Sequence, residues 1–537
     1  MIYQTKIRED PNHPSVFSDP IAGTLYRGKI NIHVDTKVIT GPLAKKMVEE
    51  HKKRIPRTTH PRYEAILNIT GKKIGPFIEG VRVEGKLTQW FFDAVLNVGT
   101  HGPFGYNDPE ILKKMGRWQH LAGSKYAGTD FYTISSDGMP LQADLAALLN
   151  KTAKESFGFN FMIKFTNSGT EANEDASKVA MFNKFRQLRQ KLSNDLFKQM
   201  KKQLGIKEIR KDGLLSNYPM FVIAFKGGFH GRSAGSLTYT FSKLAHKEGY
   251  QTIQYVKHLE YDSSVDFENA IDDRPLEKLI KNKELRAVID SGKVPIDLLS
   301  MVIFEPVQGE GGYRFPDDGF LKKLNDFLKK YKDKKKFVFV DDEIQAGMGR
   351  TGTIFAIEYY MKKYKHLKPD IITLAKPLLI GAAIIRKELL VNWPGSKFSG
   401  TWSGGDVIAI ACGFYTLEKL LRKNPDPYLG RTYLENARIG GEELRKGLRE
   451  LAEKFNEKHP ELITNIRGIG QMTAFDLPDS KIRDEYEHEL FLHGVHMIAT
   501  GEKSMRIFGA VDQAPRERKI LLKAMEDSVE SLLEKLK

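Results

Sequence analysis

The sequence predicts an α/β fold in which a mostly parallel sheet is flanked by helices, accompanied by a smaller α+β domain. Between about residues 130 and 395, helical stretches alternate with short apolar strands. This alternation is typical of a parallel sheet with helices on both faces. After Pro394 the chain becomes mainly amphipathic helix, as over residues 434–455, and short strands follow near Met472 and Met505. We therefore expect two domains that meet close to Pro394.

The same change of pattern sets the domain boundaries. We assign residues 130–395 to the large domain and residues 396–537 to a C-terminal small domain. Residues 1–84 are polar and contain one candidate helix, at residues 41–55. A chain of 537 residues is long enough to bury more than one hydrophobic core.

Composition agrees with a soluble globular protein but does not by itself show an enzyme. Hydrophobic residues make up 41% and charged residues 28% of the chain, which is ordinary for such a protein, and no run reaches the length of a membrane span. The N-terminus lacks the apolar core of a secretory signal. Cys412 is the only cysteine, which excludes an intrachain disulfide and a cysteine-ligated iron–sulfur cluster within one chain. We expect a cytoplasmic protein.

Two strand ends carry the residues with the clearest chemistry. Lys376 closes the apolar run at residues 369–376, and Asp342 lies near the end of the earlier apolar run at residues 337–345. A pyridoxal phosphate enzyme needs this pair, because a lysine amine binds the cofactor aldehyde and a carboxylate keeps the pyridine nitrogen protonated. A solvent-facing lysine and an ordinary acidic strand end are the alternative, and the pair alone does not decide between them.

A helix start upstream suits a phosphate group. Ser168 and Glu171 have the spacing of a capping box, so the Ser168-Gly169-Thr170 run should open a helix. Apolar residues then recur with helical periodicity at Ala172, Ala176, Val179 and Ala180. The free N–H groups and dipole of such a helix attract an anion, and glycine permits close approach. An ordinary capped helix is the alternative.

Four further motifs follow in order. Phe229 could stack on a flat ring, and Arg232 could clamp a carboxylate, just after the apolar strand at residues 221–225. The other three motifs are the runs EPVQGEGG at residues 305–312, GRTG at residues 349–352 and TWSGG at residues 401–405.

In this order the motifs resemble those of the class III aminotransferases, which are fold-type I pyridoxal phosphate-dependent transferases. The resemblance spans roughly residues 85–510. It is strongest to the branch of 4-aminobutyrate and L-lysine 6-aminotransferases, through RGIGQMTAFDLPD at residues 467–479, FHGR at residues 229–232 and the short segment at residues 376–381. The resemblance also implies that the N-terminal segment, residues 1–129, completes the small domain.

The resemblance assigns roles around the cofactor. Lys376 would hold pyridoxal phosphate and carry the proton, Asp342 would face the ring nitrogen, and Gln345 would lie near the ring hydroxyl. The phosphate cup would be formed by Ser168, Gly169 and Thr170. Phe229 would stack on the ring, and Thr401 would reach the phosphate of the other subunit. The last role implies a homodimer or a higher oligomer of dimers.

The resemblance also assigns the substrate contacts. Arg232 and Arg506 match the arginines that receive substrate carboxylates, and Glu310 matches a glutamate that pairs with the second arginine while the amino donor is bound. Release of that pair would admit 2-oxoglutarate. The implied reaction moves the terminal amino group of an ω-amino acid, of the L-lysine or 4-aminobutyrate type, to this 2-oxo acid.

Three positions depart from the family pattern. Pro377 follows the lysine, and proline favours extended backbone at the preceding residue. Residues 507–510 replace a run that usually contains proline, and Asp406 stands where asparagine is common. A racemase, an aminomutase or a dialkylglycine decarboxylase of the same fold remains an alternative, as does a non-enzymatic basic binding protein.

The formal net charge of +16 comes in part from residues 186–210, where a leucine or methionine recurs every fourth position among basic residues. We interpret this stretch as one basic amphipathic helix inserted after the phosphate-binding helix, with its apolar stripe on the enzyme body. A nucleic-acid or membrane-surface role is the alternative. We expect neither a nucleic acid nor a membrane as a partner.

Overall fold

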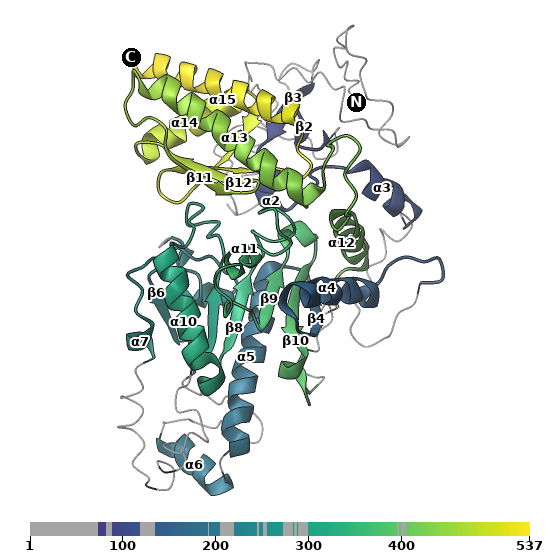
Figure 1. Cartoon of the computed structure of the whole chain (residues 1–537), viewed down its shortest axis with the longest axis vertical. Coiled ribbons are helices and arrows are strands. Elements are labelled where there is room, and N and C mark those ends of the chain that lie inside the picture. The colour runs from purple at the N-terminus through teal and green to yellow at the C-terminus, as the bar shows by residue number, and fades with distance from the viewer. Residues whose placement is uncertain are drawn as a thin grey trace.

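The computed structural model shows two layered bodies, with the larger sheet in the lower half of Figure 1 and helices α13, α14 and α15 at the top. Thr401 and the candidate helix at residues 41–55 lie outside the described residues. The structure describes residues 73–81, 88–118, 135–191, 193–203, 220–243, 246–250, 255–271, 283, 287, 299–394, 397–398 and 404–537.

The large sheet has seven strands in the order β4-β10-β9-β8-β7-β5-β6. The β10 strand is antiparallel to both of its neighbours, and the other four pairings are parallel. The predicted mostly parallel sheet is therefore confirmed. The bounds are β4 (Phe161–Thr166), β5 (Phe221–Phe225), β6 (Tyr255–Leu259), β7 (Leu299–Phe304), β8 (Val338–Asp342), β9 (Ile371–Leu374) and β10 (Gly381–Arg386).

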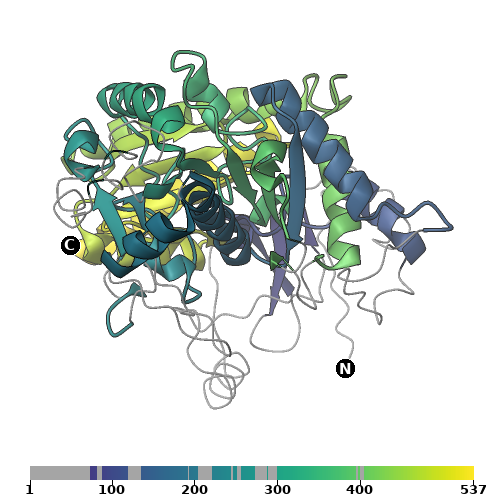
Figure 2. The same cartoon turned by 90° about the horizontal axis from the view of Figure 1, so that it is seen from below.

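Helices cover both faces of this sheet (Figure 1 and Figure 2). The central strands are apolar on both sides, as expected for a sheet buried between helices. On one face α5 (Gly169–Lys191) packs small residues, including Ala176 and Val179, against strand residues such as Val340. On the other face α10 (Asp318–Lys335) packs aromatic and leucine side chains, including Phe320, in the other core cluster.

The small domain is built around an antiparallel sheet in the order β11-β12-β15-β14. Its strands are β11 (Thr464–Ile469), β12 (Met472–Asp476), β14 (Ile498–Thr500) and β15 (Ser504–Phe508). Its core is shared with α13 (Tyr433–Asn456), α14 (Ser480–Leu492) and α15 (Pro515–Leu536). The predicted helix at residues 434–455 and the strands near Met472 and Met505 are thus confirmed.

A third sheet joins distant parts of the chain. It has the order β1-β2-β3-β13, and β13 pairs with β3 in parallel. Its strands are β1 (Lys73–Ile74), β2 (Phe77–Val81), β3 (Thr88–Asp93) and β13 (Val495–His496). The other helices are α2 (Leu96–Gly99), α3 (Pro109–Met115), α4 (Gln142–Phe157), α6 (Asn194–Gln203), α7 (Phe267–Ala270), α11 (Ile357–Met361) and α12 (Val407–Leu420).

The basic insert differs from its prediction. The helix α5 continues to Lys191, and a separate helix, α6, begins at Asn194, so a single inserted helix at residues 186–210 is wrong. Ser193 is the reason, because its hydroxyl accepts a hydrogen bond from the N–H of Leu196 (3.3 Å) and its carbonyl accepts one from Phe197 (2.8 Å). Phe197 is buried in the large core. In the described part of the chain, no helix combines the length and apolarity of a membrane span.

Candidate active site

Lys376 follows β9 at the edge where the parallel strands end. It is partly buried and opens a short 3-10 turn, η4 (Lys376–Leu378), rather than the extended backbone that Pro377 led us to expect. Two hydrogen bonds hold the turn, from the N–H groups of Leu378 and Leu379 to the carbonyls of Ala375 and Lys376. Burial lowers the pKa of Lys376 to about 8, although the Glu310 carboxylate opposes this shift. A lowered pKa makes the neutral, nucleophilic amine accessible near neutral pH.

Asp342 is held in one orientation at the end of β8. Its Oδ2 atom accepts a hydrogen bond from Nδ2 of Asn173 (2.8 Å) and lies 2.8 Å from Nδ1 of His230, and its Oδ1 atom accepts one from the N–H of Ile344 (3.1 Å). The carboxylate is only 3% exposed. Such a fixed, desolvated charge stabilises a nearby positive charge far more than a solvated one does.

Asn173 and His230 were given no role by the sequence. The amide of Asn173 also donates to the carbonyl of His230 and accepts from the hydroxyl of Thr373, both at 2.8 Å. Both residues lie inside motifs singled out above, and Asn173 stands four positions after Gly169, on the same face of α5. That spacing was a usable signal for Asn173. The contact of His230, which follows β5, with Asp342 at the end of β8 depends on the strand order of the sheet, in which β7 lies between the two strands.

The neighbours of Asp342 face the other side of the strand. Burial raises the pKa of Asp341 well above its ordinary range, and the nearby Glu343 adds to that shift. Burial likewise raises the pKa of Glu343 to about 7, although its hydrogen bond from the N–H of Ile357 opposes this. Neither carboxyl shares the Asn173–His230 contacts, which distinguishes Asp342 from the two acids beside it.

Gln345 and Gly309 lie close together near these strand ends. Gln345 is 6% exposed, and its Oε1 atom has no hydrogen-bond partner within the described structure. A Cβ atom on Gly309 would fall 1.7 Å from that oxygen, so only glycine fits there. An unsatisfied buried acceptor is costly, and this one is suited to a donor on a bound molecule.

The start of α5 has the predicted cap. The Ser168 hydroxyl and the N–H of Asn167 both donate to Oε2 of Glu171, at 3.2 and 2.8 Å. A Cβ atom on Gly169 would approach Ile344 to 2.7 Å, which packs this turn tightly against the Asp342 segment. The Thr170 hydroxyl is bonded to the hydroxyls of Ser233 and Ser236, so the backbone amides of this turn are the groups left to bind an anion.

Arg506 and Glu310 form a buried ion pair next to Lys376. Nη1 of Arg506 lies 2.8 Å from Oε1 of Glu310 and donates to the carbonyl of Gly309 at 3.1 Å. The two side chains are 4% and 19% exposed. Burial alone would raise the pKa of Glu310, but Arg506 lowers it to about 2. The pair joins the loop after β7 to strand β15 of the small domain.

Arg232 has a different environment. Its side chain is exposed, its Nη2 lies 2.8 Å from Nε2 of His246, and its guanidinium carbon is 6.0 Å from the centre of the Phe229 ring. Phe229 is partly buried, and its N–H donates to Oε2 of Glu305 (2.8 Å). Arg232 and Phe229 are therefore neighbours, as their spacing suggested.

Arg350 is a further buried cation that the sequence left without a role. It is 1% exposed, donates from Nη2 to the carbonyl of Gly99 (2.7 Å), and lies 3.6 Å from the centre of the Phe508 ring. Among the described residues no carboxylate pairs with it, and its Nε and Nη1 atoms have no hydrogen-bond partner. Burial lowers its pKa to about 9. Its charge contributes to the low pKa of Lys376.

The fold and this constellation define a fold-type I pyridoxal phosphate-dependent transferase. Residues 103–527 match the family described as aminotransferase class-III, and the chain belongs to the class III aminotransferases. It is a pyridoxal phosphate-dependent transaminase, whose substrates are an amino donor and a 2-oxo acid.

Several known proteins are similar to it. The 4-aminobutyrate aminotransferase of Schizosaccharomyces pombe is 26% identical over 502 residues, which cover 92% of this chain and 95% of that protein. The acetylornithine aminotransferase of Prochlorococcus marinus is 28% identical over 439 residues, covering 80% and 85%. The structure of lysine aminotransferase from M. tuberculosis in the internal aldimine form matches with a TM-score of 0.65 and 20% identity, covering 91% of this chain and 99% of that chain.

The residues present fit pyridoxal phosphate. The buried, unpartnered Oε1 of Gln345 suits the ring hydroxyl, and the fixed carboxylate of Asp342 suits the ring nitrogen. The glycine-containing turn at the start of α5 suits the phosphate, and Lys376 supplies an amine of lowered pKa. When bound, the cofactor supplies an electron sink for the substrate's electrons.

Proposed function

We propose that this enzyme transfers the terminal amino group of an ω-amino acid, of the L-lysine or 4-aminobutyrate type, to 2-oxoglutarate. The observation that carries the proposal is the buried Glu310–Arg506 ion pair, at 2.8 Å, beside Lys376. An enzyme that alternates between a donor with a terminal amine and a dicarboxylate acceptor needs a positive group that can be masked and exposed in turn. This pair provides one.

In the donor half-reaction, Glu310 neutralises Arg506, so the reacting end of the pocket carries little net charge and a terminal amine can enter. Arg232 then binds the distant carboxylate of the donor. The Nζ atom of Lys376, once free, takes the proton from the carbon that bears the amine, which its pKa of about 8 allows. Asp342 keeps the ring nitrogen protonated throughout.

In the acceptor half-reaction, the α-carboxylate of 2-oxoglutarate displaces Glu310 and forms a paired contact with Arg506. Glu310 is 19% exposed, against 4% for Arg506, so the carboxylate has room to turn toward solvent while the arginine stays in place. The carbonyl of Gly309 keeps one nitrogen of the guanidinium oriented during the exchange.

We also propose a homodimer in which Thr401 reaches the phosphate bound by the partner subunit, and a cytoplasmic location. The TWSGG run supports the first proposal. Size-exclusion chromatography with light scattering gives the subunit number. A crystal structure of the holoenzyme with Thr401 far from every phosphate would reject the shared site.

The substrate assignment is tested by following each half-reaction separately. The purified holoenzyme is mixed with L-lysine, 4-aminobutyrate, L-ornithine or a diamine in a stopped-flow spectrometer, and loss of the cofactor's visible absorbance reports amine transfer. Addition of 2-oxoglutarate should restore the absorbance. Lys376→Ala should show neither change, because it lacks the amine that binds the cofactor. Reaction with none of the ω-amino donors would reject the proposal in favour of another class III reaction.

A further inference from the structure

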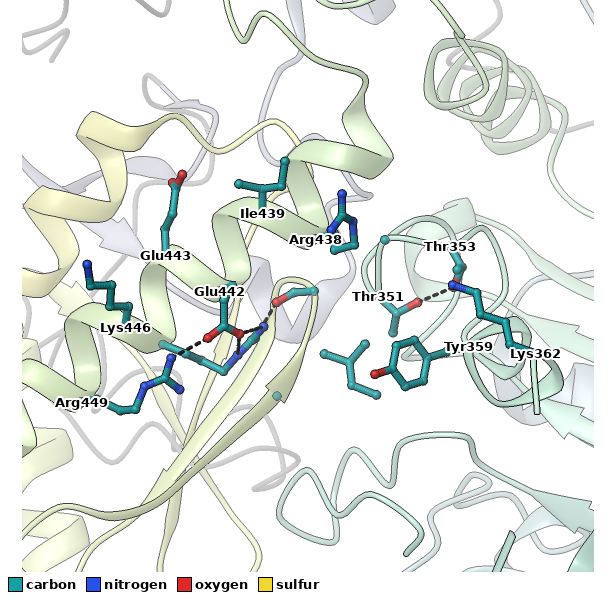
Figure 3. Close-up of a pocket in the computed structure, with 15 residues that line it drawn as sticks. Thr351, Thr353, Tyr359, Lys362, Arg438, Ile439, Glu442, Glu443, Lys446 and Arg449 are labelled. Carbon is teal, nitrogen blue, oxygen red and sulfur yellow. Dashed lines mark hydrogen bonds and ion pairs between the residues drawn. The ribbon is translucent and has the colours of Figure 1, made fainter. Parts of the chain in front are cut away.

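A cavity lies between the two domains, outside the set of catalytic contacts described above. It has a volume of about 700 Å³ and is bounded on one wall by the turn at residues 351–353 and α11, and on the other by α13 and the β11–β12 turn. Figure 3 shows Tyr359 and Lys362 on the first wall, facing the α13 wall that carries Glu442 and Arg449. A cavity of this size accommodates a small organic molecule.

The charge of the lining is predominantly positive. Five cationic side chains and two carboxylates line the cavity, namely Lys362, Arg438, Arg445, Lys446 and Arg449 against Glu442 and Glu443. Both carboxylates are already neutralised, since Glu442 pairs with Arg445 and Arg449, and Glu443 pairs with Arg518 from outside the cavity.

Lys446 pairs with Glu450 at 4.0 Å, which leaves two of the five cations available for a ligand. Lys362 follows α11 on one wall and Arg438 belongs to α13 on the other. Among the described residues neither side chain makes an ion pair within 4.0 Å, and both cations are exposed. They still act on nearby carboxylates, since Lys362 opposes the burial that raises the pKa of Glu358, and Arg438 adds to the hydrogen bonds that lower the pKa of Glu435. One unpaired cation on each wall matches a single group that carries about two negative charges, as a phosphomonoester does near pH 7.

The remaining lining supplies neutral hydrogen-bonding groups and an aromatic ring. The hydroxyls of Thr351 and Thr353 lie 3.0 Å apart at the edge of the first wall. Tyr359 is 49% exposed, and Nζ of Lys362 is 5.8 Å from its ring centre. An exposed ring beside a cation can stack on a flat ligand whose anionic group the cation binds.

We propose that this cleft binds a small molecule that carries both a phosphomonoester and an aromatic ring, such as a mononucleotide or a pyridoxine phosphate. The phosphate bridges Lys362 and Arg438, and the ring stacks on Tyr359. A volume of about 700 Å³ leaves room for a group larger than a phosphate.

The site contacts both domains at their junction, so ligand binding depends on how the two domains are arranged. At its floor the N–H of Gln471 donates to the carbonyl of Arg350 at 2.8 Å, and a Cβ atom on Gly470 would fall 2.2 Å from that oxygen. Arg350 thus presents its carbonyl at the domain junction and its guanidinium toward Gly99 and Phe508. A ligand that bridges both walls stabilises the junction beside this arginine.

The test is isothermal titration calorimetry of the holoenzyme, in which the cofactor already fills the catalytic phosphate cup. AMP and pyridoxine 5′-phosphate are the probes, and adenosine is the control without a phosphate. Lys362→Gln and Arg438→Gln should each weaken binding of the probe about tenfold or more, the loss expected for one hydrogen bond to a charged group. Tyr359→Ala should weaken binding of the organic probes but leave that of inorganic pyrophosphate unchanged.

Lys363→Gln is the matched control, because Lys363 is the next residue and pairs with Asp318 away from the cavity. It should change binding less than twofold. Binding of one probe alone supports the site and identifies which ring it accepts. The proposal is overturned if neither probe binds at millimolar concentration, if adenosine binds as well as AMP, or if Lys363→Gln weakens binding as much as Lys362→Gln.

Discussion

The residues that we propose to face the cofactor and those that we propose to face the substrate are organised in opposite ways. Asp342 is buried and makes hydrogen bonds with Asn173, His230 and the backbone N–H of Ile344, all from the large domain. The two arginines proposed to bind substrate come from different domains. Arg506 is buried and paired with Glu310, whereas Arg232 is exposed, lies 2.8 Å from Nε2 of His246 and has its guanidinium carbon 6.0 Å from the centre of the Phe229 ring.

This difference reflects what each region must do. A charged group that stabilises the same developing charge in both half-reactions is most effective when it is immobile. Its hydrogen bonds then need no rearrangement during the reaction. A carboxylate receptor that serves two substrates must instead exchange partners. An ion pair with one partly exposed member permits this, and so does an arginine at the surface.

The largest effect is expected for Asp342→Asn. The substitution keeps the shape of the side chain and removes the fixed charge, so the rate of amine transfer should fall by about a hundredfold or more while the cofactor stays bound. Single-turnover absorbance measurements give the rate, and the visible spectrum gives the cofactor content.

Asp341→Asn is its control. Burial raises the pKa of Asp341 well above its ordinary range, so the neutral amide resembles the protonated acid and the rate should change little. A large loss in Asp341→Asn with a small loss in Asp342→Asn would reverse the assignment of the two acids.

Next in size is the opposite response of Arg506→Ala and Glu310→Ala. Arg506→Ala should slow the 2-oxoglutarate half-reaction by roughly ten- to a hundredfold more than the donor half-reaction, because a charged hydrogen bond contributes about 1.5–3 kcal/mol. Glu310→Ala should mainly damage the donor half, since an unmasked Arg506 attracts carboxylates. Equal damage to both halves in both variants would remove the exchange mechanism.

A smaller effect is expected for Arg232→Ala. Because the side chain is exposed and screened by solvent, the KM for the ω-amino donor should rise by about fivefold or less, with kcat nearly unchanged. The increase should vanish at high salt, and Arg232→Lys should retain part of the binding. A hundredfold loss would show that Arg232 becomes buried when substrate binds.

The smallest effect concerns the protonation of Lys376. Folding lowers the pKa of Lys376 from 10.5 to about 8, so between these values the unfolded chain binds more protons than the folded one. The contribution of Lys376 to the free energy of unfolding of the apoprotein therefore increases as the pH rises through this window. Lys376→Met has no amine to titrate, so the amount by which its free energy of unfolding exceeds that of the wild type should shrink over the same window. Urea unfolding of both apoproteins at pH 7.5 and 10 measures this change. A constant difference would contradict the lowered pKa.

The pKa of Lys376 can also be measured from the pH dependence of cofactor binding. The rate at which apoprotein combines with pyridoxal phosphate should rise with pH around a midpoint near 8. Because the Glu310 carboxylate raises the pKa of Lys376, Glu310→Gln should move the midpoint to lower pH. A midpoint near 10 in the wild type would mean that the amine is solvated.

Local sequence patterns were sufficient for the elements that carry the catalytic pair. The apolar runs ending near Asp342 and Lys376 form β8 and β9, and the Ser168–Glu171 spacing forms the cap at the start of α5. These features depend on neighbouring residues, and their signals lie within a few positions of one another. Element order then placed them at the same edge of a parallel sheet.

Local sequence patterns did not predict the boundary at which one helix ends and the next begins. The regular apolar spacing of residues 186–210 continued across Ser193, yet the serine caps a new helix there. Pro377 was expected to extend the backbone at Lys376, but two hydrogen bonds across Lys376–Leu378 hold a 3-10 turn.

Only the tertiary structure decided which charges are paired and which are isolated. Arg506 and Glu310 are 196 positions apart, and the family resemblance suggested their contact while the packing of β15 against the loop after β7 produces it. The isolation of Arg350 had no sequence signal at all. Burial and electrostatic interaction depend on the distance through space, and chain folding sets that distance independently of the separation along the sequence.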